Sequence, residues 1–352
     1  MNALGQRIAR LIRSQGPISV AEFMSVALHD RQSGYYARRD PLGADFTTAP
    51  EISQAFGELL GLWCAQVWTD QGRPASVQLV ELGPGRGTMM RDALRALRVV
   101  PEFHSALEVV LVEASPVLAE KQREALGDCH LPLRWVTNAG AIDRGKPIFL
   151  LANEFFDALP AQQFIFTERG WQERVISADE GETLGFALAP APTTLRVPPQ
   201  RGSPEPGAVY EVSPSTLALV GNLATGIAQA GGAALFIDYG YGEAGFGETL
   251  QAVGRNHFAD VLSEPGEMDV SAHVDFAALR DVALSAGCDV FGPIPQGRFL
   301  CTMGIAERAA RLSRKSDEHT LAIERLIDPR QMGELFKVLA ILPPGAPAPP
   351  GF

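Results

Sequence analysis

Cysteine and histidine are scarce in this sequence of 352 residues, and neither forms a metal-binding pattern. The four cysteines, Cys64, Cys129, Cys288 and Cys301, show no CxxC spacing and no Cys/His cluster. A structural zinc site normally needs such spacing, and a disulfide framework is typical of small secreted chains. We therefore expect reduced thiols and no metal.

Basic residues are in the minority, and long apolar runs are missing. The chain has 30 Lys and Arg against 41 Asp and Glu, which gives a net charge of −11. An acidic chain repels phosphate backbones, so we expect no nucleic acid partner. The longest uncharged run, 212–237, is broken by Gly, Pro, Ser, Asn and Gln. We therefore expect no membrane insertion.

The N-terminus combines arginines with apolar residues. Arg7, Arg10 and Arg13 precede the first acid, as they would in a mitochondrial transit peptide. The alternative, which we favour, is an amphipathic helix that ends at Gly16-Pro17. Its apolar face would consist of Leu4, Ile8, Leu11 and Ile12.

From residue 77 onward, apolar strands alternate with helical segments. This alternation predicts a Rossmann-like α/β fold, with a parallel sheet covered by helices on both faces. The expected parallel strands are 77–82, 107–113, 133–136, 147–153 and 233–238. Short strands with turns between them predict an antiparallel insertion after the fourth strand. Residues 99–105 are expected to form an extra loop, and the Pro-rich tail from residue 343 to be disordered.

The predicted organisation has five segments. An N-terminal helical segment is expected to pack on a ligand site, and a C-terminal helix and Pro-rich tail follow the core. The segments are 1–70 (helical), 71–160 (core), 161–208 (antiparallel insertion), 209–310 (remainder of the core) and 311–352 (helix and tail).

A glycine-rich turn follows the first strand, directly after an acid. Glu81 is followed by Gly83, Gly85 and Gly87 at alternate positions. Glycine allows a sharp turn and a close approach of the backbone to a ligand. Dinucleotide folds use G-x-G-x-x-G, and here the third glycine comes one residue early. The pattern indicates S-adenosylmethionine (SAM), with Glu81 and the glycines at its methionine part. The alternative is a tight turn that binds nothing.

A second acid, Glu113, closes the second strand. In this position a carboxylate can accept hydrogen bonds from both hydroxyl groups of a ribose. The alternative is an acid that only complements the positive end of the following helix. Together with the glycine turn, Glu113 predicts a nucleoside ligand.

Polar residues also follow the fourth and fifth strands. Asn153, Glu154 and Asp157 come at the end of the fourth strand, and Asp238 and Tyr239 at the end of the fifth. Ligands of open α/β sheets bind beyond the carboxyl ends of the strands. We predict catalytic roles for the first three, since carboxylates form bidentate bonds to a guanidinium, and substrate-binding roles for Asp238 and Tyr239. The alternatives are helix capping and a strand-end turn.

Many motifs, in order, make this chain resemble the MidA-like protein arginine methyltransferases from about residue 8 to residue 306. The motifs are Gly34-Tyr35-Tyr36, the segment Asp45 to Ser53 (DFTTAPEIS), the VELGPGRG turn, Asn153 to Pro160, Ile237-Asp238-Tyr239-Gly240, Pro265-Gly266 with Asp269, His273 to Phe276, and Gln296-Gly297. Mitochondrial members of this family assist the assembly of respiratory complex I in the matrix.

The resemblance implies a class I methyltransferase core that uses SAM as its cofactor. It also implies symmetric dimethylation of an arginine on the quinone-site subunit of complex I, so the expected partner is a protein substrate. The DFTTAPEIS segment is expected to fold over the cofactor, with Thr47, Thr48 and Ser53 at its methionine end.

Because the chain begins at the first helix of the family, we expect a cytoplasmic bacterial member. The oligomeric state is left open, with a homodimer as one alternative. Two other functions also stay open: methylation of a small molecule, and a non-catalytic assembly factor that binds SAM.

Overall fold

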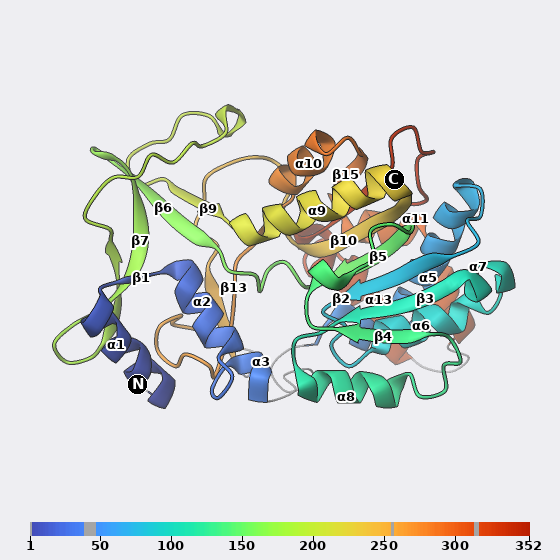
Figure 1. The fold of residues 1–352 in the computed structure, drawn as a ribbon, viewed down its shortest axis with the longest axis horizontal. Helices are drawn as coiled ribbons and strands as arrows, with labels where there is room; N and C mark the ends of the chain where they lie inside the picture. Colours follow the sequence, from blue (N-terminus) through green and yellow to red (C-terminus); the bar gives the residue numbers. More distant parts are fainter. Residues whose placement is uncertain (1, 39–46, 255–256, 313–316) are drawn as a thin grey trace. The chain divides into compact units, whose positions relative to one another are not determined.

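The computed structural model describes residues 2–38, 47–254, 257–312 and 317–352. The chain folds into two compact units (Figure 1). Unit 1 contains residues 1–46, 157–216 and 243–275, and unit 2 contains residues 47–156, 217–242 and 276–352. These units differ from the expected segments: the helical segment 1–70 is divided at residue 46, and the insertion 161–208 is part of a larger unit.

Unit 2 is built on a mostly parallel sheet whose strand order is β15-β16-β10-β5-β2-β3-β4. The bounds are β2 Val77–Leu82, β3 Leu107–Val112, β4 Leu133–Val136, β5 Ile148–Asn153, β10 Gly232–Tyr241, β15 Asp289–Pro295 and β16 Phe336–Leu342. The five strands from β10 to β4 in this order are parallel to their neighbours, as predicted. The strands β15 and β16 add an antiparallel edge that the sequence analysis did not predict.

Two predictions for unit 2 are wrong. The segment 99–105 was expected to be a loop, but residues 101–106 form α7. The tail from residue 343 was expected to be disordered, yet the Phe352 ring lies 5.5 Å from the ring of Phe299. The indole Nε1 of Trp63 also donates a hydrogen bond to the carbonyl of Pro350 at 3.1 Å. A composition rich in Pro and Ala does not reveal such contacts, because they depend on distant residues.

Helices accompany the sheet of unit 2. They are α4 Ala49–Ile52, α5 Gln54–Asp70, α6 Thr88–Leu97, α7 Pro101–Ala106, α8 Pro116–Ala125, α9 Pro214–Ala230, α10 Phe276–Ser285, α11 Gln296–Thr302, α12 Ile305–Leu312, α13 Asp317–Ile327 and α14 Met332–Leu335, with a 3-10 turn at Ala139–Ala141. The first three residues of α9 belong to unit 1.

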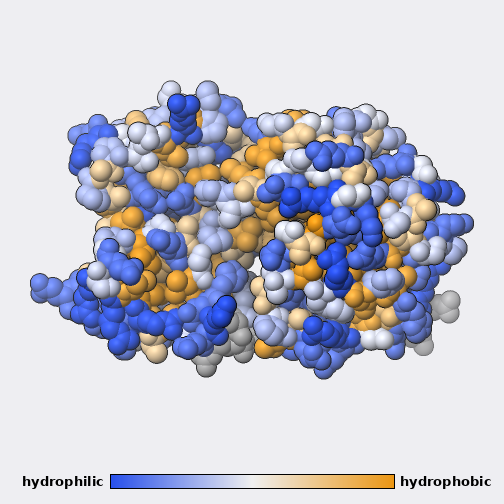
Figure 2. Space-filling view, in the orientation of Figure 1, coloured by the Kyte–Doolittle hydropathy of each residue, from blue (hydrophilic) through white to orange (hydrophobic). Residues whose placement is uncertain are grey.

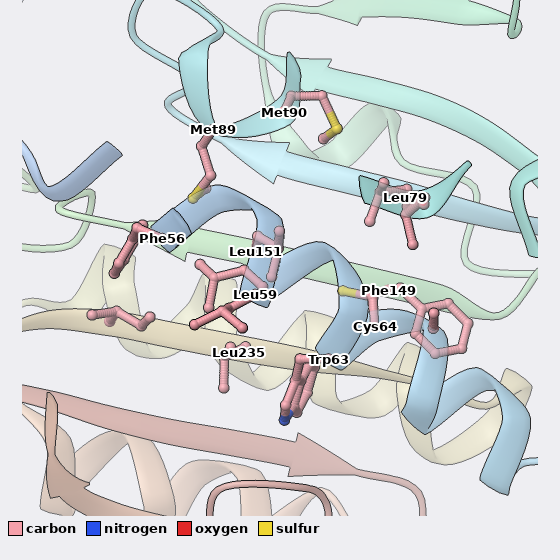
Figure 3. Packing of buried hydrophobic residues seen from close by; sticks show 14 of the residues in the cluster. Phe56, Leu59, Trp63, Cys64, Leu79, Met89, Met90, Phe149, Leu151 and Leu235 are labelled. Atoms are coloured by element: carbon pink, nitrogen blue, oxygen red, sulfur yellow. The ribbon is translucent and has the colours of Figure 1, made fainter. Parts of the chain in front are cut away.

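The core of unit 2 lies between α5 and one face of the sheet. Figure 3 shows Phe56, Leu59 and Trp63 projecting from α5 toward Leu151 and Leu235 of the strands, and all five belong to one buried cluster. The residues that alternate with the cluster members along the strands are buried as well; they include Val80, Val110, Leu150 and Phe236. Burial on both faces is what a parallel sheet between helices requires.

Unit 1 combines the first helices with antiparallel strands. The helices are α1 Ala3–Gln15, α2 Val20–His29 and α3 Tyr35–Arg38, with a 3-10 turn at Pro199–Arg201. The strands are β1 Ile18–Ser19, β6 Gln162–Thr167, β7 Gly170–Ala178, β8 Leu184–Leu188, β9 Val209–Val212, β11 Gln251–Gly254, β12 His257–Ala259, β13 Asp269–Ser271 and β14 Val274–Asp275. The antiparallel pairing of β6, β7 and β8 confirms the predicted insertion.

The first helix is amphipathic, as we favoured. Leu4, Ile8 and Ile12 are buried in the core of unit 1, whereas Leu11 is exposed, contrary to the predicted face. On the face of the molecule seen in Figure 2, hydrophilic side chains are frequent and apolar ones show between them. Such mixed surfaces are common in globular proteins. No helix in the described part of the chain is long and apolar enough to cross a membrane.

Candidate functional site

The glycine turn after β2 takes a left-handed path at all three predicted positions. The φ angles are +61° at Gly83, +54° at Gly85 and +79° at Gly87. The amide of Gly87 donates to the carbonyl of Pro84 at 2.8 Å, and α6 begins directly afterwards at Thr88. Left-handed backbone is strained for residues that carry a Cβ atom. The three glycines are therefore needed for the shape of the turn.

Space around this turn is limited as well. A Cβ atom on Gly83 would lie 2.8 Å from Cδ2 of Phe155, and one on Gly87 would lie 3.3 Å from Cα of Gln122. A side chain added at Gly83 or Gly87 would therefore force the turn or its neighbours to shift. A backbone held in this way can present its own amide and carbonyl groups to a ligand.

Glu81, the acid before the turn, is buried and only partly satisfied. It accepts a backbone hydrogen bond from Met90, while its Oε2 atom has no hydrogen-bond partner among the described residues. Burial, reinforced by the nearby charge of Glu113, raises the pKa of Glu81 to about 8. A buried acceptor without a partner is unfavourable. The positive charge of a ligand would favour the ionised form of Glu81, and its N–H donors would give the Oε2 atom a hydrogen-bond partner.

Glu113 lies at the end of β3, as predicted, and is half-buried. Its Oε1 atom accepts from the amide of Ser115 at 2.7 Å, and its Oε2 atom accepts from Nε2 of Gln122 at 3.0 Å. Burial raises the pKa of Glu113 above its ordinary value. The contact with Ser115, at the start of α8, is the helix-start role given above as the alternative. Each carboxylate oxygen still has acceptor capacity for a ribose hydroxyl.

Gln122 is a site residue that the sequence analysis missed. Its buried side chain donates to the carbonyl of Gly85 at 2.8 Å and accepts from the indole Nε1 of Trp135 at 3.0 Å, in addition to its bond with Glu113. The signal was a polar residue on the buried face of α8, where Leu118 and Ala119 are its neighbours. Gln122 thus connects the glycine turn to the second acid.

The end of β5 brings Asn153 and Glu154 together. The Oε1 atom of Glu154 accepts from Nδ2 of Asn153 at 3.0 Å and from the amide of Ala49 at 2.9 Å. Glu154 has a φ angle of +50°, which is unusual for a residue with a side chain. The Oδ1 atom of Asn153 is buried and has no hydrogen-bond partner among the described residues. Backbone strain and an unsatisfied acceptor are typical of functional sites.

Asp157 belongs to unit 1, whereas Asn153 and Glu154 belong to unit 2. Its carbonyl accepts from the amide of Ala272 at 3.0 Å. Burial, reinforced by the charges of Asp269 and Asp157, raises the pKa of Tyr36, whose hydroxyl donates to Asp269 at 2.8 Å. The catalytic role of Asp157 remains a prediction.

Asp238 braces the turn after β5. It is fully buried; its Oδ2 atom accepts from the amides of Phe155 and Phe156 at 3.1 and 2.9 Å, and its Oδ1 atom from the amide of Tyr239 at 2.9 Å. These are the contacts of a strand-end turn, the alternative given above. The Tyr239 ring packs on Phe336 at 5.5 Å. The substrate-binding roles of Asp238 and Tyr239 stay predictions.

The described part of the DFTTAPEIS segment contains Thr47, Thr48 and Ser53, the residues predicted to meet the cofactor. The hydroxyl of Ser53 caps α5 by accepting from the amide of Ala55 at 3.3 Å. Thr48 precedes α4 without a side-chain capping bond, and Thr47 is half-buried. Two other residues of the segment bond to the site: the amide of Ala49 donates to Glu154, and the carboxylate of Glu51 accepts from the hydroxyl of Thr88. Residues 45 and 46 lie outside the described residues, and the cofactor roles of Thr47, Thr48 and Ser53 remain predictions.

The assembled site has the chemistry of a receptor for a cationic ligand. Glu81, Glu113, Asn153 and Glu154 offer acceptor oxygens at the ends of β2, β3 and β5. The described residues contain no group of three or more His, Cys, Asp or Glu side chains that could hold a metal ion. Burial raises the pKa of the Cys64 thiol, which therefore stays protonated and unreactive.

Comparison with known proteins gives three kinds of match. Residues 59–294 match a family of S-adenosyl-L-methionine-dependent methyltransferases. The mitochondrial protein arginine methyltransferase NDUFAF7 of Danio rerio is 38% identical over 96% of this chain and 86% of its own length. The Homo sapiens protein of the same name is 38% identical over 94% of this chain and 81% of its own length.

A solved structure resembles the whole chain. It is the crystal structure of a Burkholderia thailandensis protein bound to S-adenosyl-homocysteine (SAH), with 29% sequence identity and a TM-score of 0.85. The match covers 99% of this chain and 94% of that protein. The likeness to this solved structure therefore extends over both units and not only over the parallel sheet.

Proposed function

The chain belongs to the S-adenosylmethionine-dependent methyltransferase family, and from this premise we propose that it methylates an arginine side chain of a protein. The observation that carries the proposal is a pair of buried acceptors, Oε2 of Glu81 on β2 and Oδ1 of Asn153 on β5, that lack a hydrogen-bond partner within the described part of the chain. They lie at the carboxyl ends of two adjacent strands. Both the cofactor and an arginine carry positive charge and N–H donors that suit such acceptors.

SAM is the cofactor, and when bound it supplies a methyl group on a positively charged sulfur. The residues present fit this group. We assign Glu81 and the glycine turn to the methionine part, because the buried carboxylate can hold an ammonium and the backbone can approach closely. We assign Glu113 to the ribose hydroxyls. A phosphate-bearing cofactor would bring negative charge toward these two acids.

Asn153 and Glu154 are assigned to the acceptor. A guanidinium can donate N–H bonds to the Glu154 carboxylate and to Oδ1 of Asn153, which orients one nitrogen for attack. In the reaction a C–N bond forms as the C–S bond breaks, and the methylated nitrogen loses one proton. Glu154 stabilises the positive charge during attack and can accept that proton before solvent takes it. The backbone amide of Ala49 and the side-chain Nδ2 of Asn153 keep the carboxylate of Glu154 in one orientation.

The finer target that we propose is an arginine of a quinone-site subunit of respiratory complex I. Support comes from the family resemblance and from the mitochondrial relatives named as protein arginine methyltransferases. In a bacterium this target would be met in the cytoplasm, and in a eukaryote in the mitochondrial matrix. The number of methyl groups transferred can be read from the mass of the modified peptide.

The test is the variant Glu154→Gln, assayed with tritiated SAM and a cell lysate from which small molecules can be separated. We expect labelled protein bands with the natural chain and a loss of about a hundredfold or more in label with the variant, because the transition-state charge is no longer stabilised. SAH affinity, measured by calorimetry, should change less than threefold. The matched control is Glu120→Gln, which neutralises an exposed glutamate on α8.

Two other outcomes would support a different function, and a third would contradict the role of Glu154. Label only in the small-molecule fraction would support the small-molecule alternative. SAH binding without any labelled product would support the non-catalytic assembly factor. Full labelling of protein by Glu154→Gln would contradict the role assigned to Glu154.

A further inference from the structure

A single helical turn, α4 (Ala49–Ile52), connects the two ends of the candidate site within unit 2. At its start, the amide of Ala49 donates to Oε1 of Glu154 at 2.9 Å. From its middle, Glu51 accepts through Oε1 from the hydroxyl of Thr88 at 2.5 Å. Thr88 is the first residue of α6 and directly follows Gly87 of the glycine turn. One short element is therefore bonded both to the proposed acceptor site and to the cofactor turn.

A helix of four residues has too few internal hydrogen bonds to hold its own position. Its placement must come from tertiary contacts, and two kinds are present. Ala49 is buried in the core of unit 2, which anchors the backbone. The bond between Glu51 and Thr88 then fixes the rotation of the turn, because it joins a side chain of α4 to the first residue of a ten-residue helix.

We infer that Glu51 and Thr88 are positioning residues, which lock α4 onto the glycine turn and thereby hold the Ala49 amide against Glu154. The inference rests on the proposed function, since Glu154 is there the residue that orients the acceptor. Its consequence is that the orientation of the catalytic carboxylate depends on the anchoring of α4 to the cofactor turn. The strained φ angle of Glu154 fits this view, because a strained residue needs surrounding contacts to hold it.

The test compares variants that remove the hydrogen bond with variants that retain it. Thr88→Val and Glu51→Leu remove it, whereas Thr88→Ser keeps the donor and Glu51→Gln keeps an acceptor without the charge. We expect the first two to lower kcat about tenfold with SAH affinity changed less than threefold. The two retaining variants should stay within about threefold of the natural enzyme. Thr225→Val is the matched control, because its hydroxyl donates within α9 to Gly221.

A second readout does not depend on the acceptor. Hydrogen exchange of the peptide that covers residues 47–54 should be faster in Thr88→Val and Glu51→Leu than in the natural protein. The double variant should be no worse in kcat than either single variant, since both remove one interaction. If Glu154→Gln proves fully active, the role assigned to Glu154 fails, while faster exchange at Ala49 would still support the lock.

Two results would overturn the inference. Natural kcat and natural exchange in Thr88→Val would show that α4 is held without this bond. An impairment of Glu51→Gln as large as that of Glu51→Leu would show that the charge itself matters, and would make Glu51 a binding residue instead of a positioning residue.

Discussion

Two turns at the same edge of one sheet reach the left-handed backbone region by different means. After β2, the three left-handed positions are all glycine, which adopts this region freely. After β5, the left-handed residue is Glu154, and for a residue with a side chain this conformation costs roughly 1–2 kcal/mol. The first turn needs a bare backbone near its ligand. The second turn needs a carboxylate at that position, so neighbouring residues must stabilise the strained backbone of Glu154.

The two turns are held in place by different side chains. The glycine turn is held by the side chain of Gln122, which bonds to the carbonyl of Gly85. The turn after β5 is held by Asp238, which accepts from the amides of Phe155 and Phe156. In both cases a buried polar side chain from another element satisfies the backbone of the turn. Local sequence thus sets which backbone conformation a turn can adopt, and polar groups distant in the sequence decide whether that conformation persists.

The largest expected effect comes from adding a side chain to the glycine turn. In Gly83→Ala, the left-handed strain adds to a Cβ contact of 2.8 Å with Phe155, so the turn must move away from its ligand-binding shape. We expect SAH affinity to fall by about a hundredfold, as measured by calorimetry, if strain and crowding together amount to roughly 3 kcal/mol.

The matched control for that prediction is Gly72→Ala. Gly72 also has a left-handed backbone, with a φ angle of +81°, but a Cβ atom there would meet nothing within 4 Å. We expect a loss of stability from strain alone and natural SAH affinity. If both variants bound SAH equally well, the close packing of the glycine turn would not matter for binding.

A smaller effect should follow from pH, because burial and Glu113 raise the pKa of Glu81 to about 8. Below this pKa Glu81 is mostly neutral and attracts an ammonium poorly. From pH 7 to pH 9 the ionised fraction rises about tenfold, so SAH should bind up to about tenfold more tightly after correction for the ligand's own titration. Glu81→Gln should abolish this pH dependence. A flat profile in the natural protein would contradict the assignment of Glu81.

The same pKa has a consequence for stability, with the opposite direction in pH. The folded-state pKa lies above the unfolded value of 4.5, so the folded chain binds the extra proton between these values. The contribution of Glu81 to the free energy of unfolding is fully present below pH 4.5 and is lost as pH rises through 8. Denaturant titrations of Glu81→Gln and the natural protein should therefore diverge over this window, with the natural protein losing stability relative to the variant.

The smallest expected effect concerns the turn after β5. Glu154→Ala and Glu154→Gly remove the same contacts, so they differ mainly in backbone preference. At a φ angle of +50°, the glycine variant should be more stable than the alanine variant by about 1 kcal/mol. At ordinary helix and strand positions the order is the reverse. Urea unfolding measures the difference, and a more stable alanine variant would mean that the turn relaxes and that Glu154 carries no strain.

Much of unit 2 could be predicted from local patterns. The five parallel strands follow from short apolar segments that alternate with helices, and the glycine turn follows from spacing alone. The antiparallel strand β16 was missed, because a short apolar run such as residues 336–342 does not distinguish a strand from a buried helix. The tail was misjudged for a different reason, since its contacts with Trp63 and Phe299 join residues that are far apart in the sequence.

The candidate site likewise has a part that local sequence predicts and a part that it does not. Local sequence was enough to identify the residues that could serve a sulfonium nucleoside: three glycines at alternate positions and an acid at the end of each of two strands. Strand length and turn chemistry are short-range properties. The folded chain was needed to reveal that Gln122 supports the turn, that Asp238 braces the backbone, and that α4 bonds to both Thr88 and Glu154. Those roles depend on buried polar groups from separate elements finding one another, and no local spacing records that.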